Sequence, residues 1–401
     1  MLAPFAKLIA ARYSARGVPV EVEFPDGGRV RLVDAPEVRV IARSVQGLRA
    51  LARPGLGGLA RAYVRGDLDF SGSARRILDI AERMVGDSPL GREPLGSRVR
   101  VWMHQRRANR NNISHHYDVS NAFYRMWLDE RMVYSCAYFR HEADTLDQAQ
   151  TQKLDHICRK LRLQPGERML DIGCGWGGLI FRAAEEFGAL ATGITLSRHQ
   201  YDHVRAEIDR RGLEGRVRVE LMDYSDLPED ASYDKVASVG MFEHVGVARL
   251  RKYFGKIYRV LKPGGLLLNH GITHNALGVS AVGGGIGDFI ESYVFPGGEL
   301  THVSRVIEAM AACGLEAFDA EALREHYAKT LWHWTERLEA NGEAAQREVG
   351  EERYRVWRIY MAGSAHAFER GWLSVWQITA GRPDTDGRVP HPLTRDDIYG
   401  S

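Results

Sequence analysis

The sequence predicts an α/β fold, in which a doubly wound, mostly parallel sheet follows a smaller α+β domain and carries a helical lid at its C-terminal end. From about residue 150, short apolar runs alternate with amphipathic segments of helical period. This alternation is typical of parallel strands covered by helices. The stretch "LDIGCGWGG", residues 170–178, ends the first apolar run and opens a helix. Ligands bind beyond the carboxyl ends of such strands, so we expect a pocket there.

The alternation can be followed along the chain. In order, the predicted elements are helix 145–161, strand 168–173, helix 177–187, strand 189–196, helix 197–212, strands 216–223 and 233–240, helix 247–261 and strand 264–270. Beyond about residue 321 the chain is predicted to be helical and rich in aromatic residues, which form either core or the wall of an apolar channel. These aromatic side chains are Trp332, Trp357, Tyr360, Phe368, Trp372 and Trp376.

The N-terminal region has a different pattern. Three short strands are predicted at 20–24, 29–33 and 38–42, with "DGG" (26–28) as a hairpin turn, and a helix is predicted to end near Gly66. A stretch rich in Gly, Pro and Ser, residues 86–97, is typical of a linker. We therefore expect two domains, which comprise residues 1–100 and 101–401.

Charge is distributed unevenly over the 401 residues. Residues 1–110 hold 20 Lys and Arg against 11 Asp and Glu, although the whole chain has a net charge of only +2. A basic region favours an anionic partner such as a nucleic acid or a phospholipid surface, or it is simply a solvated surface. No apolar run reaches the roughly 18 residues that span a bilayer.

The cysteines and histidines do not form metal-binding or disulfide patterns. The four cysteines have no CxxC spacing, which favours a reduced, cytosolic compartment. None of the 15 histidines falls in an HExxH or paired Cys/His array, so no metal is expected.

The glycine loop by itself is compatible with several nucleotides. It is not a P-loop, because no GK[ST] follows. Asp171 precedes the glycines, where it would repel a pyrophosphate but attract a cationic cofactor. The second strand ends in Thr195 and lacks the acid that binds the NAD ribose. Asp223 and Tyr224 follow the third strand, where they could flank an adenine. Together these features favour S-adenosylmethionine (SAM).

Several further motifs make the chain resemble one enzyme family. They are "HHYDVSNAFYRMWL", "VYSCAYF", "TLDQAQTQKLD", "LDIGCGWGGL", "GITLSRHQ", "VGMFEHVG", "YVFPGGEL" and "HYAKTLWHW", in this order from residue 115 to about 335. They are similar to those of the cyclopropane-fatty-acid synthases, which include the mycolic acid cyclopropane synthases. The resemblance implies a class I SAM methyltransferase of Rossmann-like fold, with an N-terminal lipid-associating domain like that of the phospholipid-acting members.

The resemblance also implies the reaction and its residues. The methyl group of SAM would be added to a cis double bond of a phospholipid acyl chain, and a bound bicarbonate would remove the proton that closes the ring. Proton loss elsewhere would instead give an exocyclic methylene, and reduction of this methylene by a partner would give a methyl branch. The implied catalytic residues are Cys136, Glu243, His270, Ile272 and Tyr327. The implied cofactor residues are Tyr134, Ser135, Asp171, Gly173, Gly175, Thr195, Leu196, Gln200, Asp223 and Tyr224.

Other residues in these motifs are open to simpler interpretations. Cys174 is expected to be a small buried residue. His115 and His116 either form a polar surface or touch a ligand, and His244 is expected to point away from Glu243 if that segment ends a strand. Residues 283–287, "GGGIG", would form a flap.

The resemblance further implies a homodimer in the cytoplasm, at the inner membrane face. Two other hypotheses are a nucleic-acid-binding protein and a methyltransferase for small soluble molecules.

Overall fold

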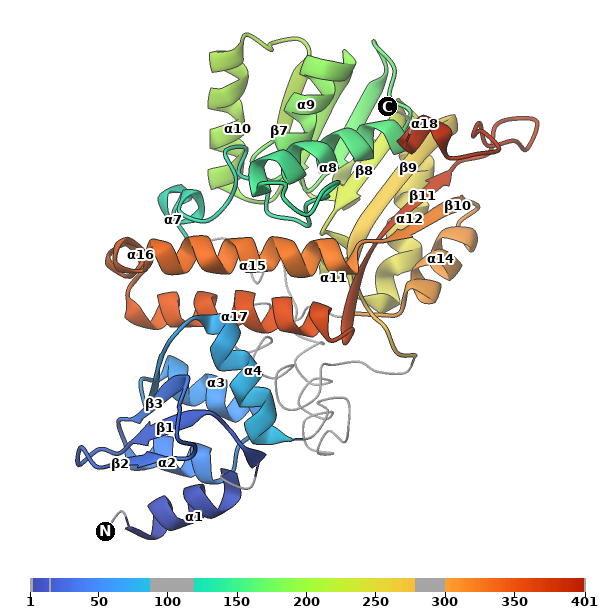
Figure 1. Cartoon of the computed structure of the whole chain (residues 1–401). Coiled ribbons are helices and arrows are strands. Elements are labelled where there is room, and N and C mark those ends of the chain that lie inside the picture. The colour runs from blue at the N-terminus through green and yellow to red at the C-terminus, as the bar shows by residue number, and fades with distance from the viewer. Residues whose placement is uncertain (1–2, 14–15, 87–118, 278–299, 400–401) are drawn as a thin grey trace. The chain divides into compact units, whose positions relative to one another are not determined.

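The computed structural model of the chain describes residues 3–13, 16–86, 119–277 and 300–399 (Figure 1). The described residues divide into two compact units. The first unit contains the N-terminal residues up to 86 together with residues 331–367, and the second contains residues 119–277, 300–330 and 368–399. The two predicted domains were continuous segments, whereas each unit combines separate stretches of the chain.

A seven-stranded sheet forms the centre of the second unit, with the strand order β10-β11-β9-β8-β5-β6-β7. β11 runs antiparallel to both of its neighbours, β10 and β9, and the five strands from β9 to β7 are mutually parallel. The strands are β5 (Arg168–Ile172), β6 (Leu190–Thr195), β7 (Val217–Leu221), β8 (Tyr233–Val239), β9 (Leu261–His274), β10 (Glu316–Ala322) and β11 (Leu373–Gly381). The predicted mostly parallel, doubly wound sheet is confirmed.

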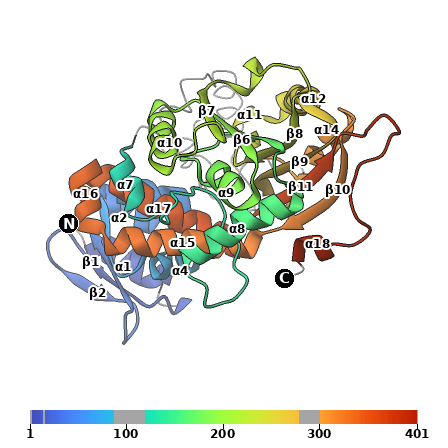
Figure 2. The same cartoon turned by 90° about the horizontal axis from the view of Figure 1, so that it is seen from above.

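Helices cover both faces of this sheet (Figure 2). The helical elements of the unit are α7 (Asn121–Arg125), α8 (Leu146–Lys160), α9 (Gly178–Phe187), α10 (Arg198–Arg211), η2 (Tyr224–Asp226), α11 (Phe242–Val245), η3 (Val247–Arg249), α12 (Leu250–Val260), α14 (Val303–Ala311) and α18 (Asp396–Tyr399). Leu266 and Leu268 of β9 pack in the core with α8, α9 and α10, while Leu267 packs with α12 and α14. The continuous apolar run of β9 is therefore needed because both of its faces are buried.

Local sequence signals set the ends of the helices that border the sheet. The Thr145 side chain accepts from the backbone N–H of Gln148, whose side chain in turn accepts from the Thr145 N–H, so α8 begins with a capping box. At the start of α10 the Ser197 side chain accepts from the backbone N–H of Gln200, and Gly212 ends this helix in the left-handed conformation.

The prediction that Trp372 and Trp376 lie on helices is wrong. Trp376 lies within strand β11, and Trp372 directly precedes that strand. The run from Leu373 to Gly381 pairs along its length with β9 and also with β10, so it fills a gap in the sheet between them. Aromatic and β-branched residues suit a strand that is buried on both faces. The preceding segment has a helical period, which predicted that the helix continues, but pairing with β9 and β10 makes these residues a strand.

The first unit contains a four-stranded sheet with the order β2-β1-β3-β4. The predicted hairpin is confirmed, since β1 and β2 pair antiparallel on either side of "DGG". The strands are β1 (Val20–Glu23), β2 (Arg29–Arg31), β3 (Val38–Ala42) and β4 (Leu68–Ser71), and the helices are α1 (Ala3–Tyr13), α2 (Val45–Ala52), α3 (Leu56–Val64) and α4 (Ala74–Val85), followed by α16 (Gly342–Val349) and α17 (Glu351–Glu369). Helix α15 (Arg324–Ala340) begins in the second unit and continues into the first.

Buried arginines explain why residues 331–367 belong to the N-terminal unit. Arg358 of α17 donates to the Tyr63 hydroxyl and to the carboxylate of Glu339, and Arg355 donates to the Tyr63 carbonyl. Such charge-assisted hydrogen bonds, made by largely buried guanidinium groups, fix α17 against α3. The predicted boundary near residue 100 could not reveal this, because the partners lie nearly 300 residues apart in the sequence.

None of the described helices is long and apolar enough to cross a membrane. The predicted linker (86–97), the flap residues 283–287 and the histidines His115 and His116 lie, apart from Gly86, outside the described residues. Gly86 itself ends α4 in the left-handed conformation.

Candidate active site

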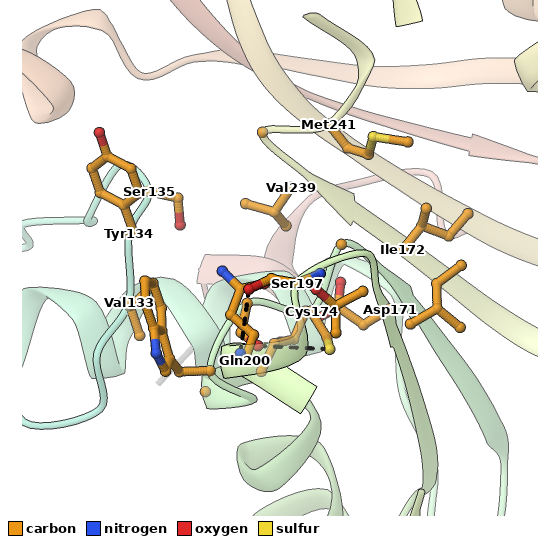
Figure 3. Close-up of a pocket in the computed structure, with 18 of the residues that line it drawn as sticks. Val133, Tyr134, Ser135, Asp171, Ile172, Cys174, Ser197, Gln200, Val239 and Met241 are labelled. Atoms are coloured by element: carbon orange, nitrogen blue, oxygen red, sulfur yellow. Dashed lines mark hydrogen bonds between the residues drawn. The ribbon is translucent and has the colours of Figure 1, made fainter. Parts of the chain in front are cut away.

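One pocket lies at the carboxyl ends of β5, β6, β7 and β8 (Figure 3). It is called the cofactor pocket below. All ten residues predicted to bind the cofactor line it, namely Tyr134, Ser135, Asp171, Gly173, Gly175, Thr195, Leu196, Gln200, Asp223 and Tyr224. Residues distant in the sequence meet here because parallel strands bring their carboxyl ends to one edge of the sheet.

The glycine loop follows β5 and needs its bare backbone. Gly173 and Gly175 adopt φ angles of 83° and 56°, which side chains disfavour. The backbone N–H groups of Gly173 and Cys174 donate to the carbonyl of Ile194, which pins the loop to β6. The loop therefore presents backbone atoms to the pocket at a fixed position.

Cys174 is a packing residue, as the sequence predicted. A Cβ atom at Gly193 of β6 would lie 2.7 Å from both the Cβ and the Sγ of Cys174, so the cysteine occupies the space that this glycine leaves. Burial raises the pKa of the Cys174 thiol well above its usual value. The thiol is therefore uncharged near neutral pH and is a poor nucleophile.

Asp171, at the end of β5, provides a buried acid that suits a cationic ligand. Its side chain is 3% exposed, and its Oδ1 atom has no hydrogen-bond partner among the described residues. Burial raises the pKa of Asp171 to about 7, and nearby Lys153 opposes this rise. An unsatisfied buried carboxylate is costly, and the positive charge of SAM would offset that cost.

The segment before Cys136 is held in place by two buried polar side chains. Asp129 accepts from the backbone N–H groups of Arg131 and Val133, at 3.0 and 2.8 Å. Gln150 of α8 donates through Nε2 to the carbonyls of Val133 and Ser135. These bonds fix the backbone on which Tyr134 and Ser135 face the cofactor pocket.

Hydrogen bonds orient the polar residues that follow β6 and β7. The Thr195 hydroxyl donates to Oε1 of Gln200 at 2.7 Å. Asp223 accepts through Oδ1 from the backbone N–H and the hydroxyl of Ser225. The Tyr224 ring packs edge-on against Tyr253, with 5.0 Å between the ring centroids. This part of the pocket therefore has defined positions for the polar groups of a nucleoside.

The five residues predicted to be catalytic are called the buried polar set: the buried residues Cys136, Glu243, His270 and Tyr327, and the half-buried Ile272, which contributes its backbone N–H. None of them is among the described residues that line the cofactor pocket. Cys136 directly follows Ser135, however, and Glu243 lies between Met241 and His244, which do line the pocket. The buried polar set thus adjoins the pocket along the chain.

Glu243, His270 and Ile272 form one part of this set. Glu243, in α11, accepts through Oε1 from the backbone N–H of Ile272 at 2.6 Å, and its Oε2 has no partner among the described residues. Burial raises the pKa of Glu243 to about 7. His270 lies two residues before Ile272 on β9, with its Nδ1 3.2 Å from Nε2 of Gln377. Burial lowers the pKa of His270 to about 3, so its imidazole is neutral.

Cys136 and Tyr327 form the other part, linked through Leu323. The carbonyl of Leu323 accepts from the Tyr327 backbone N–H at 3.0 Å and lies 3.8 Å from the Cys136 Sγ. Burial raises the pKa of the Cys136 thiol far above its usual value. The Tyr327 ring packs on Phe368, with 4.8 Å between centroids. Both side chains are buried, so this region excludes water.

The sequence analysis missed several pocket residues, among them Lys153 and Trp176. Lys153 and Trp176 line the cofactor pocket, and the Trp176 indole N–H donates to Oδ1 of Asn121. The signal for Lys153 was its position on the apolar face of α8. His244 and Glu243 lie in helix α11 and not at the end of a strand, and His244 lines the cofactor pocket whereas Glu243 does not.

Among the residues that the structure describes, no group of three or more His, Cys, Asp or Glu side chains could hold a metal ion. The predicted absence of a metal stays a prediction.

The sheet with its single antiparallel strand, and the pocket across its parallel strands, define a class I SAM-dependent methyltransferase fold. The structure of the mycolic acid cyclopropane synthase CmaA1 complexed with SAH and CTAB superposes with a TM-score of 0.64 and 35% identity, covering 68% of this chain and 98% of that one. The chain belongs to the mycolic acid cyclopropane synthetase family, whose sequence profile matches residues 104–378.

Two relatives with different names are similar to this chain. A probable fatty acid methyltransferase of Pseudomonas putida is 45% identical over 386 residues, which cover 95% of this chain and 96% of the relative. Cyclopropane mycolic acid synthase 1 of Mycobacterium tuberculosis is 36% identical and covers 67% of this chain and 96% of its own length. The protein is therefore a methyltransferase of the cyclopropane synthase family.

Proposed function

We propose that the protein adds a methylene group across a cis double bond of an unsaturated acyl chain in a membrane phospholipid. The observation that supports this proposal is the buried carboxyl group of Glu243, whose pKa is raised to about 7 and which stands in the chain between the pocket residues Met241 and His244. The P. putida relative supports a fatty acyl substrate, since it is named a probable fatty acid methyltransferase and matches nearly the whole chain.

The residues of the cofactor pocket fit SAM. Asp171 would face its positive charge, the glycine loop would approach it through backbone atoms, and Asp223, Gln200 and Tyr224 would hold its nucleoside. When bound, SAM supplies an electrophilic methyl group. The chain need provide no nucleophile of its own, because the electron pair comes from the alkene. Its tasks are orientation and the exclusion of water.

Formation of the new C–C bond leaves a positive charge on the acyl chain. Loss of one proton from the added methyl group then closes the three-membered ring, so the lipid gains CH2 in total. A group at the buried polar set must accept this proton. The carboxyl of Glu243 has a pKa near the operating pH, which suits a group that holds or transfers a proton.

Bicarbonate, which would serve as the proton acceptor, also fits the chemistry of this set. Neutral His270, protonated Glu243 and the Tyr327 hydroxyl are hydrogen-bond donors for an anion. The backbone N–H of Ile272 already donates to Glu243, so Ile272 would act by orienting that carboxyl group. We propose that Cys136 contributes to the same site from the segment after Ser135.

The phospholipid surface is proposed from the charge of the chain. The net charge of +9 over residues 1–110 favours anionic headgroups, and the protein would bind the membrane peripherally at its cytoplasmic face. A homodimer is proposed by analogy with the family.

Incubation of the protein with SAM and vesicles of cis-unsaturated phospholipid tests the proposal. Mass spectrometry of the acyl chains should show a gain of CH2, and NMR should show cyclopropane protons. Glu243→Gln should abolish most of the gain, whereas the exposed Glu214→Gln serves as a matched control and should leave it intact. If the protein binds SAM but the mass of the lipid does not change, the proposed phospholipid substrate is wrong.

A second product is favoured by the name of the P. putida relative, which mentions methyl transfer without a ring. A hydride shift that moves the positive charge to the methyl-bearing carbon, followed by proton loss from the methyl group, would give a methylene-branched chain of the same mass. Alkene protons in place of cyclopropane protons in the NMR spectrum would establish this alternative.

A further inference from the structure

Gln377 of β11 is a buried amide to which the proposed reaction gives no role. Its side chain is 0% exposed, and its Nε2 lies 3.2 Å from Nδ1 of His270. The two residues stand directly opposite each other where β11 pairs antiparallel with β9. Side chains of opposite residues lie on the same face of a sheet. The two strands therefore hold this amide against one edge of the imidazole ring.

The neighbour of Gln377 on the other adjacent strand is Glu321 of β10. The carboxylate of Glu321 already has three partners. It lies 2.7 Å from Nε2 of His156, accepts from the Tyr399 hydroxyl at 3.0 Å, and forms an ion pair with Lys160 at 2.6 Å. Glu321 therefore does not need the Gln377 amide as a donor, and the N–H groups of this amide remain for the imidazole on β9.

The contact fixes which nitrogen of His270 holds the proton. Burial, together with the nearby charges of Lys153 and Lys160, lowers the pKa of His270 to about 3, so the ring is neutral near pH 7. A neutral imidazole has one N–H donor and one acceptor nitrogen, and an amide nitrogen can only donate. A proton on Nδ1 would set two N–H donors against each other in a buried site, which costs free energy. Nδ1 must therefore be the acceptor.

We propose that Gln377 is a positioning residue that fixes the tautomer of His270: its amide donates to Nδ1, and the ring proton stays on Nε2. Nε2 has no hydrogen-bond partner among the residues that the structure describes, so its N–H is the donor that His270 offers to the anion of the buried polar set. The opposite tautomer would present a lone pair there and would repel the anion. The role in the reaction rests on the proposed function, whereas the tautomer itself can be measured without any substrate.

Long-range ¹H–¹⁵N NMR of the full chain, labelled with ¹⁵N-histidine, measures the tautomer directly. Protonated and unprotonated ring nitrogens have well-separated ¹⁵N shifts, and the His270 signals are assigned by their loss in His270→Asn. Near pH 7 the wild type should show a protonated Nε2 and an unprotonated Nδ1. The Nδ1 shift should also lie upfield of that of a free nitrogen, because this nitrogen accepts a hydrogen bond.

Gln377→Met removes the donor but keeps an unbranched side chain of similar size. The Nδ1–H tautomer of His270 should become populated in this variant. Turnover should fall about 10- to 100-fold, while the affinity for SAM stays within about twofold. Thr379→Val is the matched control, because Thr379 is buried two residues along the same strand and its hydroxyl has no partner among the described residues. It should keep the wild-type tautomer and turnover.

A wild-type His270 that holds its proton on Nδ1, or on both nitrogens, would overturn the proposal, as would an unchanged tautomer in Gln377→Met. If Gln377→Met does not fold, the wild-type Nδ1 shift decides, since the value of a free nitrogen contradicts the contact with the amide. Failure of the proposed function looks different. An Nε2–H tautomer that depends on Gln377, without any gain of CH2 in the phospholipid, would reject the substrate and leave this inference standing.

Discussion

The cofactor pocket and the buried polar set adjoin each other in the chain, yet they are built in different ways. The pocket takes its residues from the ends of successive parallel strands, and its glycine loop is a short motif with a fixed backbone conformation. The buried polar set combines α11, β9, α15 and the segment at Cys136, and its contacts depend on how these elements pack. The difference predicts that pocket substitutions change SAM binding, whereas substitutions in the buried polar set change turnover.

The largest effect is expected at Glu243. Glu243→Gln keeps an acceptor for the Ile272 N–H but removes the proton-binding carboxyl group, so turnover should fall about 10²- to 10⁴-fold. The affinity for SAM, measured by calorimetry, should stay within about twofold. Loss of SAM binding instead would mean that the two regions are not functionally separate.

Asp171→Asn should have the opposite pattern. Loss of the carboxylate removes the partner of a cationic cofactor, and an attraction of this kind between opposite charges in a buried site corresponds to about 10- to 100-fold in affinity. The affinity for SAM should weaken by this factor, while the affinity for SAH should change less. An equal loss of affinity for SAM and for SAH would show that Asp171 does not interact with the sulfonium charge.

The same variant should be more stable than the wild type at neutral pH. The pKa of Asp171 is raised to about 7 in the folded protein, so the folded state holds the proton more tightly than the unfolded state does. Its contribution to the free energy of unfolding is thus present at low pH and lost as pH rises from about 4 to 7. Thermal unfolding should show a gain for Asp171→Asn at pH 8 and little difference at pH 4.

A smaller effect is expected from Gly193→Ala, which tests the packing beneath the glycine loop. The new Cβ would lie 2.7 Å from Cys174 and 3.0 Å from the Ile180 side chain, and such overpacking costs about 1–3 kcal/mol. Chemical denaturation should show this loss. The double variant with Cys174→Ala should recover part of it, and strict additivity would argue against the contact.

The smallest effect is expected from Cys174→Ala alone. The cysteine lies in the most conspicuous motif of the chain, but its thiol is buried and its role is to fill space against Gly193. Turnover and SAM affinity should stay within about threefold of the wild type. A loss of turnover as large as that of Glu243→Gln would give Cys174 a chemical role and would remove the distinction between the two regions.

Most of the pocket could be predicted because its signals are local. The acid near the end of β5 and the glycines after it, the threonine that ends β6 and the Asp-Tyr pair after β7 all mark the carboxyl ends of strands whose period is visible in the sequence. Lys153 was missed because helical period says only that it faces inward. The placement of residues 373–381 was wrong because a segment that directly follows a helix became a strand only through its pairing with β9 and β10.

The sequence by itself determined the parallel sheet, the glycine loop and the kind of cofactor, since these depend on residue period and on backbone conformation over a few positions. Tertiary structure decided which groups are charged. The pKa values of Asp171, Lys153, Glu243 and His270 are shifted mainly by burial, and burial depends on segments distant in the chain. The contact between Glu243 and the Ile272 N–H likewise exists only because β9 and α11 pack together, so the chemistry next to the pocket is a property of the fold.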